Sequence, residues 1–373
     1  MNPLTDVVVQ RASFADDRRI LMISDLHGHA DGLQTLLKRA HFDQKDILVI
    51  VGDFVEKGPA SLKTVRYVMQ LCQQYTVYPL LGNVDKWRLQ CLFSDDPAVW
   101  QDMLSYSQNA QNWWGSSFLG EMYAECGWTL CDAPDVREAI PAIRERFSRE
   151  LAFLAGLPTI LETQNFLFVH GGIPHERIGE LEGTPNQPLL KRDHFMDEGL
   201  SFDRYVVVGH WPTALYTADR PCCKPIIDHE RHIISLDGGC GVRGDGQLNL
   251  VIIPDRRSNA YEYLTWDALP RITALDAQEA SAECIYIRWG EDAVEVLEQL
   301  DGMKRILRKG REMIIPDVFF WEEKGKTYCS NYTDCRLQVD VGETLTLIKT
   351  TPCGCYVKKD SCIGWYTGRY QNK

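Results

Sequence analysis

Short apolar runs recur along the amino-terminal part of the chain, and each ends on a polar or glycine-containing loop. The first run occupies residues 19–23 and stops at Ser24, with Asp25 and His27 directly behind it. Apolar runs this short, bounded by charge and glycine, predict buried strands. The same pattern recurs at residues 46–51, 75–81, 165–169, 204–209 and 232–236. We therefore expect a strand-rich core whose strands open into polar loops at their carboxyl ends.

Leucine and methionine stripes at helical spacing follow the first two runs, over residues 31–39 and 58–71. Such stripes are typical of helices that pack one face on a sheet. Residues 86–157 continue the helical pattern and are rich in tryptophan, which predicts a helical insertion. Alternating strands and helices predict an α/β domain, which we place at residues 1–270.

The pattern changes over residues 271–373, where short β-like runs replace amphipathic helices. Residues 337–341 alternate apolar with polar side chains, Gly342 marks a turn, and residues 345–348 follow, which predicts a hairpin. The closing Gly-Trp-Tyr at residues 364–366 resembles the end of a small SH3-like barrel. Such barrels bind peptides or other domains, so we expect a partner of that kind for this region.

Two features of the carboxy-terminal region leave alternatives open. Residues 294–318 read as a second, weaker copy of the barrel pattern, whereas a helix over residues 292–308 is the competing interpretation. Five cysteines cluster nearby, at Cys329, Cys335, Cys353, Cys355 and Cys362. Their spacing fits none of the usual paired zinc knuckles, which favours free thiols over a structural zinc.

Bulk composition narrows the class of protein. The chain has 373 residues, 45% of them hydrophobic and 25% charged, as in ordinary soluble proteins. Its net charge of −12 disfavours a nucleic-acid partner. No apolar run approaches the length that spans a bilayer, and the first residues lack the features of a signal peptide, so we expect no membrane partner. Thirteen cysteines, an odd number, predict reduced thiols and a cytoplasmic location.

Metal-binding side chains stand at the carboxyl ends of the predicted strands. If these strands share sheets, their carboxyl ends meet at one edge, which is where α/β folds bind ligands. That edge would hold Asp25, His27, Asp53, Asn83, His170 and His210. Three oxygen ligands and three imidazoles exceed what one tetrahedral zinc ion takes and suit two adjacent divalent ions. Two such ions promote in-line displacement at phosphorus, so the pattern points to phosphate ester hydrolysis.

These motifs, in this order, resemble those of the calcineurin-like metallophosphoesterases. The resemblance covers roughly residues 17–255 and rests on Asp25–Gly28, Gly52–Gly58, Gly82–Asp85, His170–Gly172 and Gly209–His210. It is closest to the phosphoprotein phosphatase branch, which includes bacterial serine/threonine phosphatases and diadenosine tetraphosphate hydrolases. It implies a four-layer β-sandwich flanked by helices, with residues 1–270 as the catalytic domain.

The resemblance also implies roles for individual residues. Asp25, His27 and Asp53 would hold one metal ion, while Asp53 would also bridge to a second ion. The remaining ligands of that second ion would be Asn83, His170 and His210. Manganese is the first expectation for both ions, with iron, zinc, cobalt or nickel as alternatives. Arg192 matches the segment that supplies a phosphate-gripping arginine, and its planar guanidinium suits two phosphate oxygens.

Three neighbouring positions depart from the phosphatase pattern. Val84 stands where a histidine protonates the leaving group, Glu56 where an aspartate orients that histidine, and Lys57 where an arginine lies. Without an acid, an alkoxide leaving group would cost a factor of roughly 10² to 10⁴ in rate. Either another acid serves, with Glu56, Lys57, His29 and His175 as candidates, or the substrate carries a better leaving group.

The sequence thus predicts a metal-dependent phosphoesterase in which Arg192 and Lys57 hold phosphate oxygens and a hydroxide attacks phosphorus. A phosphoprotein or small phosphomonoester is the leading substrate class on resemblance. Because Val84 replaces the acid, dinucleoside polyphosphates and phosphodiesters are the alternative substrate classes. A further alternative is a catalytically impaired binding protein that keeps the metal site and works through its carboxy-terminal region. Trp113 and Trp114, in the helical insertion, are candidates for stacking on a base or an aryl group.

Overall fold

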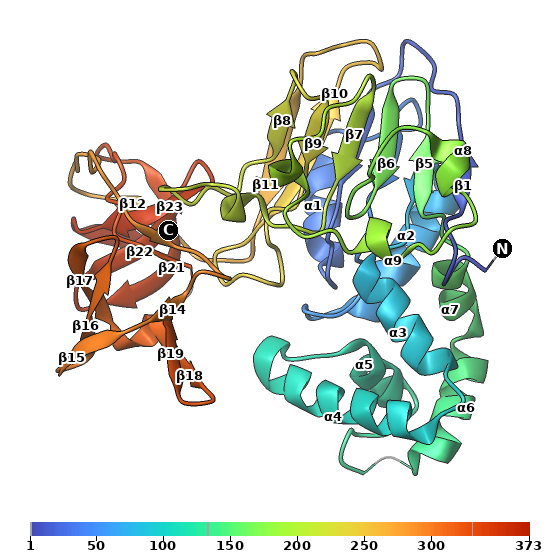
Figure 1. Cartoon of the computed structure of the whole chain (residues 1–373), viewed down its shortest axis with the longest axis horizontal. Helices are drawn as coiled ribbons and strands as arrows, with labels where there is room; N and C mark the ends of the chain where they lie inside the picture. The colour runs from blue at the N-terminus through green and yellow to red at the C-terminus, as the bar shows by residue number, and fades with distance from the viewer. Residues whose placement is uncertain (1, 133, 330) are drawn as a thin grey trace. The chain divides into compact units, whose positions relative to one another are not determined.

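The computed structural model describes residues 2–132, 134–329 and 331–373 (Figure 1). The chain divides into two compact units. The first unit comprises Met1–Pro212, Pro225–Val242 and Gly246–Asp267, and the second comprises Thr213–Lys224, Arg243–Asp245 and Ala268–Lys373. Two short segments, residues 213–224 and 243–245, belong to the second unit. The sequence pattern does not indicate this. The domain boundary at residue 270 stays a prediction.

One sheet of the first unit carries the strands of the first three motifs. Its order is β11-β10-β2-β3-β4, and β2, β3 and β4 run parallel. The bounds are β2 Ile20–Ile23, β3 Ile47–Ile50, β4 Thr76–Pro79, β10 Leu248–Ile253 and β11 Glu262–Trp266. The carboxyl ends of β2, β3 and β4 therefore lie at one edge.

A second sheet carries the strands of the later motifs. Its order is β1-β5-β6-β7-β9-β8, and β6, β7 and β9 run parallel. The bounds are β1 Val9–Arg11, β5 Ile160–Glu162, β6 Phe166–Val169, β7 Tyr205–Val208, β8 Ile226–Asp228 and β9 Ile233–Ser235. Each sheet thus supplies three neighbouring strand ends that carry polar loops.

The two sheets pack face to face, and alternating side chains decide which layer each strand residue enters. From β2, Ile20 and Met22 share one buried cluster with Phe168 of the other sheet. Leu21 and Ile23, one position out of step, join the cluster formed with the helices. Because these strands are buried on both faces, they read as continuous apolar runs rather than as alternating ones.

Helices α1 (Ala30–Arg39) and α2 (Ser61–Gln74) follow β2 and β3 and bury their leucines on the outer face of the first sheet. The helical stretch after β4 comprises α3 Asn83–Phe93, α4 Pro97–Trp114, α5 Phe118–Glu125, α6 Val136–Arg146 and α7 Ser148–Ala155. Two single-turn helices, α8 Ile178–Leu181 and α9 Gln187–Leu190, come after β6. The prediction of an α/β fold, with sheets and helices combined in one unit, is confirmed. No helix in the described part of the chain is long and apolar enough to cross a bilayer.

The second unit consists of small sheets, which confirms the β-rich prediction. Its five-stranded sheet has the order β23-β22-β21-β12-β24. Those strands are β12 Arg271–Ala274, β21 Thr344–Thr351, β22 Gly354–Lys359, β23 Cys362–Tyr366 and β24 Tyr370–Asn372. The smaller sheets use β13 Tyr286–Ile287, β14 Ala293–Val294, β15 Val296–Leu300, β16 Met303–Arg308, β17 Arg311–Pro316, β18 Phe320–Glu323, β19 Lys326–Cys329 and β20 Tyr332–Thr333.

One alternative and one expectation for this region are wrong. The competing helix over residues 292–308 is replaced by β14, β15 and β16. The pairing of β15 with β16 across a tight turn, and of β14 with β19, outweighs a local helical pattern. The hairpin over residues 337–348 does not form, because β21 pairs with β12 and β22 instead. Val339 is buried and bridges Gln278, so its alternating pattern reports an extended segment with one covered face.

The free-thiol expectation is also wrong for one of the five cysteines. Cys335 forms a disulfide with Cys284, which stands 51 residues earlier in the chain. Their Cα atoms lie 5.0 Å apart, within the range that a disulfide can bridge. The other four members of the cluster are free thiols. Spacing along the chain could not reveal the pair, because only the folded chain brings the two residues together.

Candidate metal centre

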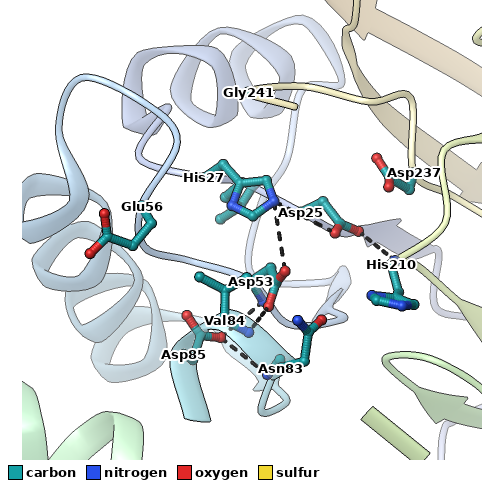
Figure 2. Close-up of polar contacts among 12 residues, drawn as sticks. Asp25, His27, Asp53, Glu56, Asn83, Val84, Asp85, His210, Asp237 and Gly241 are labelled. Atoms are coloured by element: carbon teal, nitrogen blue, oxygen red, sulfur yellow. Dashed lines mark hydrogen bonds and ion pairs between the residues drawn. The ribbon is translucent and has the colours of Figure 1, made fainter. Parts of the chain in front are cut away.

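The first two motifs converge on one buried point. Asp25 and His27 follow β2, Asp53 follows β3, and their ligand atoms all lie within 4.8 Å of one another (Figure 2). His27 Nε2 lies 3.9 Å from Asp25 Oδ1 and 3.6 Å from Asp53 Oδ2. Each of the three side chains is almost fully buried. Two carboxylates and one imidazole at this spacing suit a divalent cation.

Backbone carbonyls set the orientation of two histidine rings. His27 Nδ1 donates to Val55 O at 3.2 Å, and His170 Nδ1 donates to Val51 O at 2.7 Å. In the neutral form of each ring, this tautomer leaves the Nε2 lone pair available, which is how proteins orient metal-binding imidazoles. The two Nε2 atoms lie 3.6 Å and 3.5 Å from the same atom, Asp53 Oδ2. Asp53 Oδ2 therefore lies close to both rings, and its role as a bridging ligand stays a prediction.

Asn83, the first residue of α3, joins the group from the segment that follows β4. Its Oδ1 lies 2.9 Å from His170 Nε2, which also faces Asp53 Oδ2. With Nδ1 of His170 as the donor, three lone-pair atoms point at one another, and only a cation or a proton relieves their repulsion. Burial alone would lower the pKa of His170, but the negative charges of Asp53 and Asp25 raise it to about 10. The site therefore attracts positive charge, as a metal site must.

His210 lies at the edge of this group. Its ring centroid is 5.4 Å from that of His170, and its backbone N–H donates to Asp25 Oδ2 at 3.0 Å. Its Nε2 contacts Asp193 Oδ1 at 2.7 Å. No pattern in the sequence pointed to a role for Asp193, although it lies next to the predicted Arg192. A carboxylate on one ring nitrogen leaves the other available to a metal ion.

Burial and neighbouring charges also shift the other predicted ligands. Burial, followed by the positive charge of Lys57, lowers the pKa of His27 to about 3, so its ring stays neutral. Burial raises the pKa of Asp25 to about 6. Burial would also raise the pKa of Asp53, but His170 and His27 more than offset it, and the pKa is lowered. A neutral imidazole beside an ionised carboxylate is the protonation state that ligates a metal ion.

Asp85 holds the loop that carries Asp53, a role that was not predicted from the sequence. Its Oδ2 accepts from the N–H of Asp53 at 2.9 Å and of Gly82 at 3.1 Å. Its Oδ1 accepts from the N–H of Phe54 at 2.8 Å and of Val55 at 3.2 Å. The residue is fully buried at the first turn of α3. An acidic residue three positions after a helix cap is a recognisable sequence pattern, so the role could have been inferred.

Two motif glycines are required by close approach of the site side chains. A Cβ added to Gly82 would lie 2.1 Å from Asp53 Oδ1, and one added to Gly209 would lie 2.3 Å from Asp25 Oδ2. Any other residue at either position would displace a predicted ligand. The ligands themselves adopt unusual backbone angles, with φ of +51° at Asp25 and +55° at Asp53. Such strain, about 1–3 kcal/mol per residue, is typical of functional sites.

Glu56 does not lie with the predicted ligands. Its carboxylate is fully buried and its Oε1 lies 2.6 Å from Arg88 Nε, which is also buried. Figure 2 shows it pointing away from Asp53 and Asp25. Burial raises the pKa of Glu56, and Arg88 opposes that shift. The geometry thus gives Glu56 a structural partner, and its catalytic role stays a prediction.

The remaining candidates are held by partners of their own. Arg192 forms two hydrogen bonds of 2.7 Å with the carboxylate of Glu198. His29 contacts Leu26 O, and His175 lies 3.7 Å from Glu180. Lys57 is close enough for its charge to lower the pKa of His27. Its φ of +60° belongs to the same strained loop as Asp53. The roles of Arg192 and Lys57 toward phosphate stay predictions.

Comparison with known proteins agrees with this geometry. Residues 18–235 match the family model of the calcineurin-like phosphoesterases, which covers more than half of the chain. The chain belongs to the calcineurin-like phosphoesterases. The predicted resemblance to this family is therefore confirmed. The described residues that match include all six predicted metal ligands.

Several curated relatives share a name. The chain is 45% identical over 67 residues to the symmetrical bis(5'-nucleosyl)-tetraphosphatase of Buchnera aphidicola subsp. Schizaphis graminum (strain Sg), covering 18% of this chain and 24% of that protein. It is 29% identical over 153 residues to the protein of the same name from Vibrio cholerae serotype O1 (strain M66-2), covering 41% of this chain and 44% of that protein. The chain thus aligns with less than half the length of these relatives.

Two phosphatases are among the solved structures that the comparison matches to this chain. One is the cold-active protein-tyrosine phosphatase of a psychrophile Shewanella species, with a TM-score of 0.39 and 18% identity over 69% of this chain and 83% of that chain. The other is a protein serine/threonine phosphatase from Saccharomyces cerevisiae, with a TM-score of 0.40 and 13% identity over 72% of this chain and 85% of that chain.

Proposed function

We propose that this chain hydrolyses a phosphoanhydride bond of dinucleoside polyphosphates with the help of two divalent metal ions. The observation that carries the proposal is the position of Asp53 Oδ2, 3.6 Å from His27 Nε2 and 3.5 Å from His170 Nε2. One carboxylate oxygen between two oriented imidazoles is what a pair of neighbouring ions needs as a bridge. A single-ion site would not need lone pairs on both sides of Asp53.

The ligand sets follow from which side chains lie on each side of Asp53. Asp25 and His27 lie on one side, and Asn83 and His170 on the other, with His210 beside His170. When bound, two divalent ions, manganese in our proposal, would make water nucleophilic near neutral pH and neutralise phosphate charge. The chain contributes the orientation of both imidazoles through the carbonyls of Val55 and Val51, as well as the anchored Asp53 loop.

The absence of a proton donor for the leaving group, at the position of Val84, favours an anhydride substrate over an alkyl ester. Val84 cannot donate a proton, and its side chain is almost fully buried. Glu56, one of the candidate acids, is bound to Arg88. A nucleoside diphosphate leaves as a stable anion and needs no acid, whereas an alkoxide does. The curated relatives named as symmetrical tetraphosphatases support the same substrate class, whose hydrolysis at the central anhydride would yield two nucleoside diphosphates.

Arg192 and Lys57 remain our candidates for holding phosphate oxygens. Lys57 stands in the loop between Asp53 and α2, close to His27. Arg192 N lies 2.9 Å from the position that a Cβ on Gly171 would take, which places its backbone beside the residue that follows His170. Release of its guanidinium from Glu198 would let the bidentate fork take two phosphate oxygens instead of two carboxylate oxygens.

The deciding experiment offers the metal-loaded protein a panel of four substrates. These are diadenosine tetraphosphate, an aryl phosphomonoester, an aryl phosphodiester and a phosphopeptide, with Asp53→Asn as the control. We expect manganese-dependent release of ADP from the tetraphosphate, lost in the control. Preferred turnover of the phosphopeptide would support a protein phosphatase instead, and turnover of the diester alone a phosphodiesterase. Bound metal with no turnover of any substrate would support a binding protein.

The second unit has a separate proposed role. Its five-stranded antiparallel sheet and closing Trp365 resemble an SH3-like barrel, and we propose that it contacts a peptide or another domain. Because most of the cysteines are free thiols, we also retain the cytoplasm as the proposed compartment. Pull-down with residues 1–373 and with a variant altered only at exposed residues of this unit would test the first of these proposals.

A further inference from the structure

An aromatic group covers the carboxyl end of α4. Trp113 and Trp114 meet edge to face with ring centroids 5.3 Å apart, and Tyr106, two turns earlier, lies 6.4 Å from both rings. We name these three residues the aromatic platform. Trp113 is 62% exposed, although a tryptophan gains more than most residues from burial. Its contacts are edge-to-face, so much of the indole surface faces solvent.

Exposure alone would not single out this platform, because Trp289 in the second unit is also 53% exposed. The difference is a direct link to the metal centre. Trp114 Nε1 donates to Gly241 O at 2.9 Å. A Cβ added to Gly241 would lie 3.0 Å from His27 Cβ and 2.5 Å from Lys57 O. One glycine therefore separates the platform from a predicted metal ligand and from the loop that carries Lys57.

We propose that Trp113 stacks on a nucleobase of the substrate while the phosphates occupy the metal centre. This inference rests on the proposed function and adds a base-binding subsite to it. An acidic protein with a net charge of −12 gains little affinity for a polyanion from its overall field, so contact with the base adds binding energy to that of the phosphate contacts. A large, open indole anchored beside the phosphate site is suited to that contact.

The platform also predicts which bases are accepted. The described contacts of Trp113 are with other rings, and stacking tolerates every base because each one has a π face. The subsite should therefore accept purine and pyrimidine dinucleotides alike, with purines bound more tightly through their larger stacking surface. Diadenosine and diuridine tetraphosphate should differ in KM far more than in kcat.

Two matched probes test the subsite without turnover. ADP carries a base and pyrophosphate does not, and calorimetry of each against manganese-loaded protein measures binding directly. We expect Trp113→Ala to weaken ADP binding by roughly 5- to 100-fold, the range for loss of one stacked base, and to leave pyrophosphate binding unchanged. Trp113→Phe should retain most of the ADP affinity, because it keeps an aromatic face. Trp289→Ala, a similarly exposed tryptophan in the second unit, should behave as wild type.

Kinetics add a second, independent readout. With diadenosine tetraphosphate, Trp113→Ala should raise KM by a similar factor and leave kcat nearly unchanged. Equal weakening of ADP and pyrophosphate binding would overturn the inference, because it would mean that Trp113 supports the metal centre rather than the base. Unchanged ADP binding in Trp113→Ala would overturn it as well. Failure of the proposed function would instead appear as a wild-type protein without tetraphosphate turnover, whatever the result of the binding experiment.

Discussion

Replacing Asp85 by asparagine is the most informative single change to the metal centre. The carboxylate accepts four backbone hydrogen bonds, two on each oxygen, from Gly82 and from the loop at residues 53–55. Asparagine has the same shape but only one accepting oxygen. Its NH₂ group would face two N–H donors that are buried with it, so two bonds are lost and two donors are left unpaired.

The expected cost can be worked from these contacts. A hydrogen bond to a charged group contributes about 1.5–3 kcal/mol, so loss of two corresponds to about 3–6 kcal/mol of local stability. The effect should be concentrated where the bonds are made. It should lower hydrogen-exchange protection of the amides of Asp53, Phe54 and Val55 by roughly 10²- to 10⁴-fold, since about 1.4 kcal/mol corresponds to a factor of ten.

Hydrogen exchange measured by mass spectrometry on peptides that cover residues 50–58 reports this change directly. Calorimetry with manganese reports its consequence, because a loosened Asp53 should bind metal about 10- to 100-fold more weakly, as when other supporting residues of metal sites are removed. Asp31→Asn is the matched control. Asp31 also lies in the first turn of a helix, but its partner Lys63 is exposed, so that pair contributes little.

The result decides whether Asp85 positions the Asp53 loop or only stabilises the start of its helix. If exchange at residues 53–55 and manganese affinity both stay at the wild-type level in Asp85→Asn, the four hydrogen bonds do not hold the loop and the reasoning fails. If both change in Asp31→Asn as well, the effect belongs to helix starts in general. A change confined to Asp85→Asn supports the view that this residue positions Asp53.

Three further predictions concern the surroundings of the centre. Glu56→Gln should lower the free energy of unfolding measured in urea by about 3–5 kcal/mol, because it leaves Arg88 charged and buried without its partner. The double variant Glu56→Leu with Arg88→Met should recover most of that stability. A large loss of kcat with unchanged stability would instead make Glu56 catalytic. Metal binding should release a proton, because the pKa of His170 is raised to about 10 and its ring must lose a proton to ligate. Below pH 10, metal affinity should therefore rise by up to about tenfold for each unit by which the pH is raised. Calorimetry in buffers of different ionisation enthalpy measures the proton release, and a value of zero would contradict the prediction. Gly82→Ala should abolish metal binding in a protein that still folds by circular dichroism, because its Cβ would lie 2.1 Å from Asp53 Oδ1, and retained affinity would show that the loop can move aside.

Much of the first unit could be predicted from local pattern. The apolar runs correspond to β2, β3, β4, β6, β7 and β9, and the leucine stripes correspond to α1 and α2. These predictions succeed because burial on both faces leaves a run of apolar residues that is visible along the chain. The neighbouring motif strands within each sheet run parallel, and the two sheets pack face to face. Residues more than 100 positions apart therefore come together from different sheets, as His170 and Asp53 do.

Pairings between residues far apart in the chain could not be predicted from the sequence. Arg88 is bound to Glu56, Cys335 to Cys284, and Val339 bridges Gln278 rather than a neighbouring strand. None of these pairs shows in periodicity, which reports only whether a face is covered and not what covers it. Hydrophobic patterning and motif order thus determined the strands, the family and the set of candidate ligands. Only the tertiary structure decided which carbonyl orients each imidazole, which carboxylate anchors the Asp53 loop and which side chains lie apart from the centre, because those contacts depend on distances that the chain acquires when it folds.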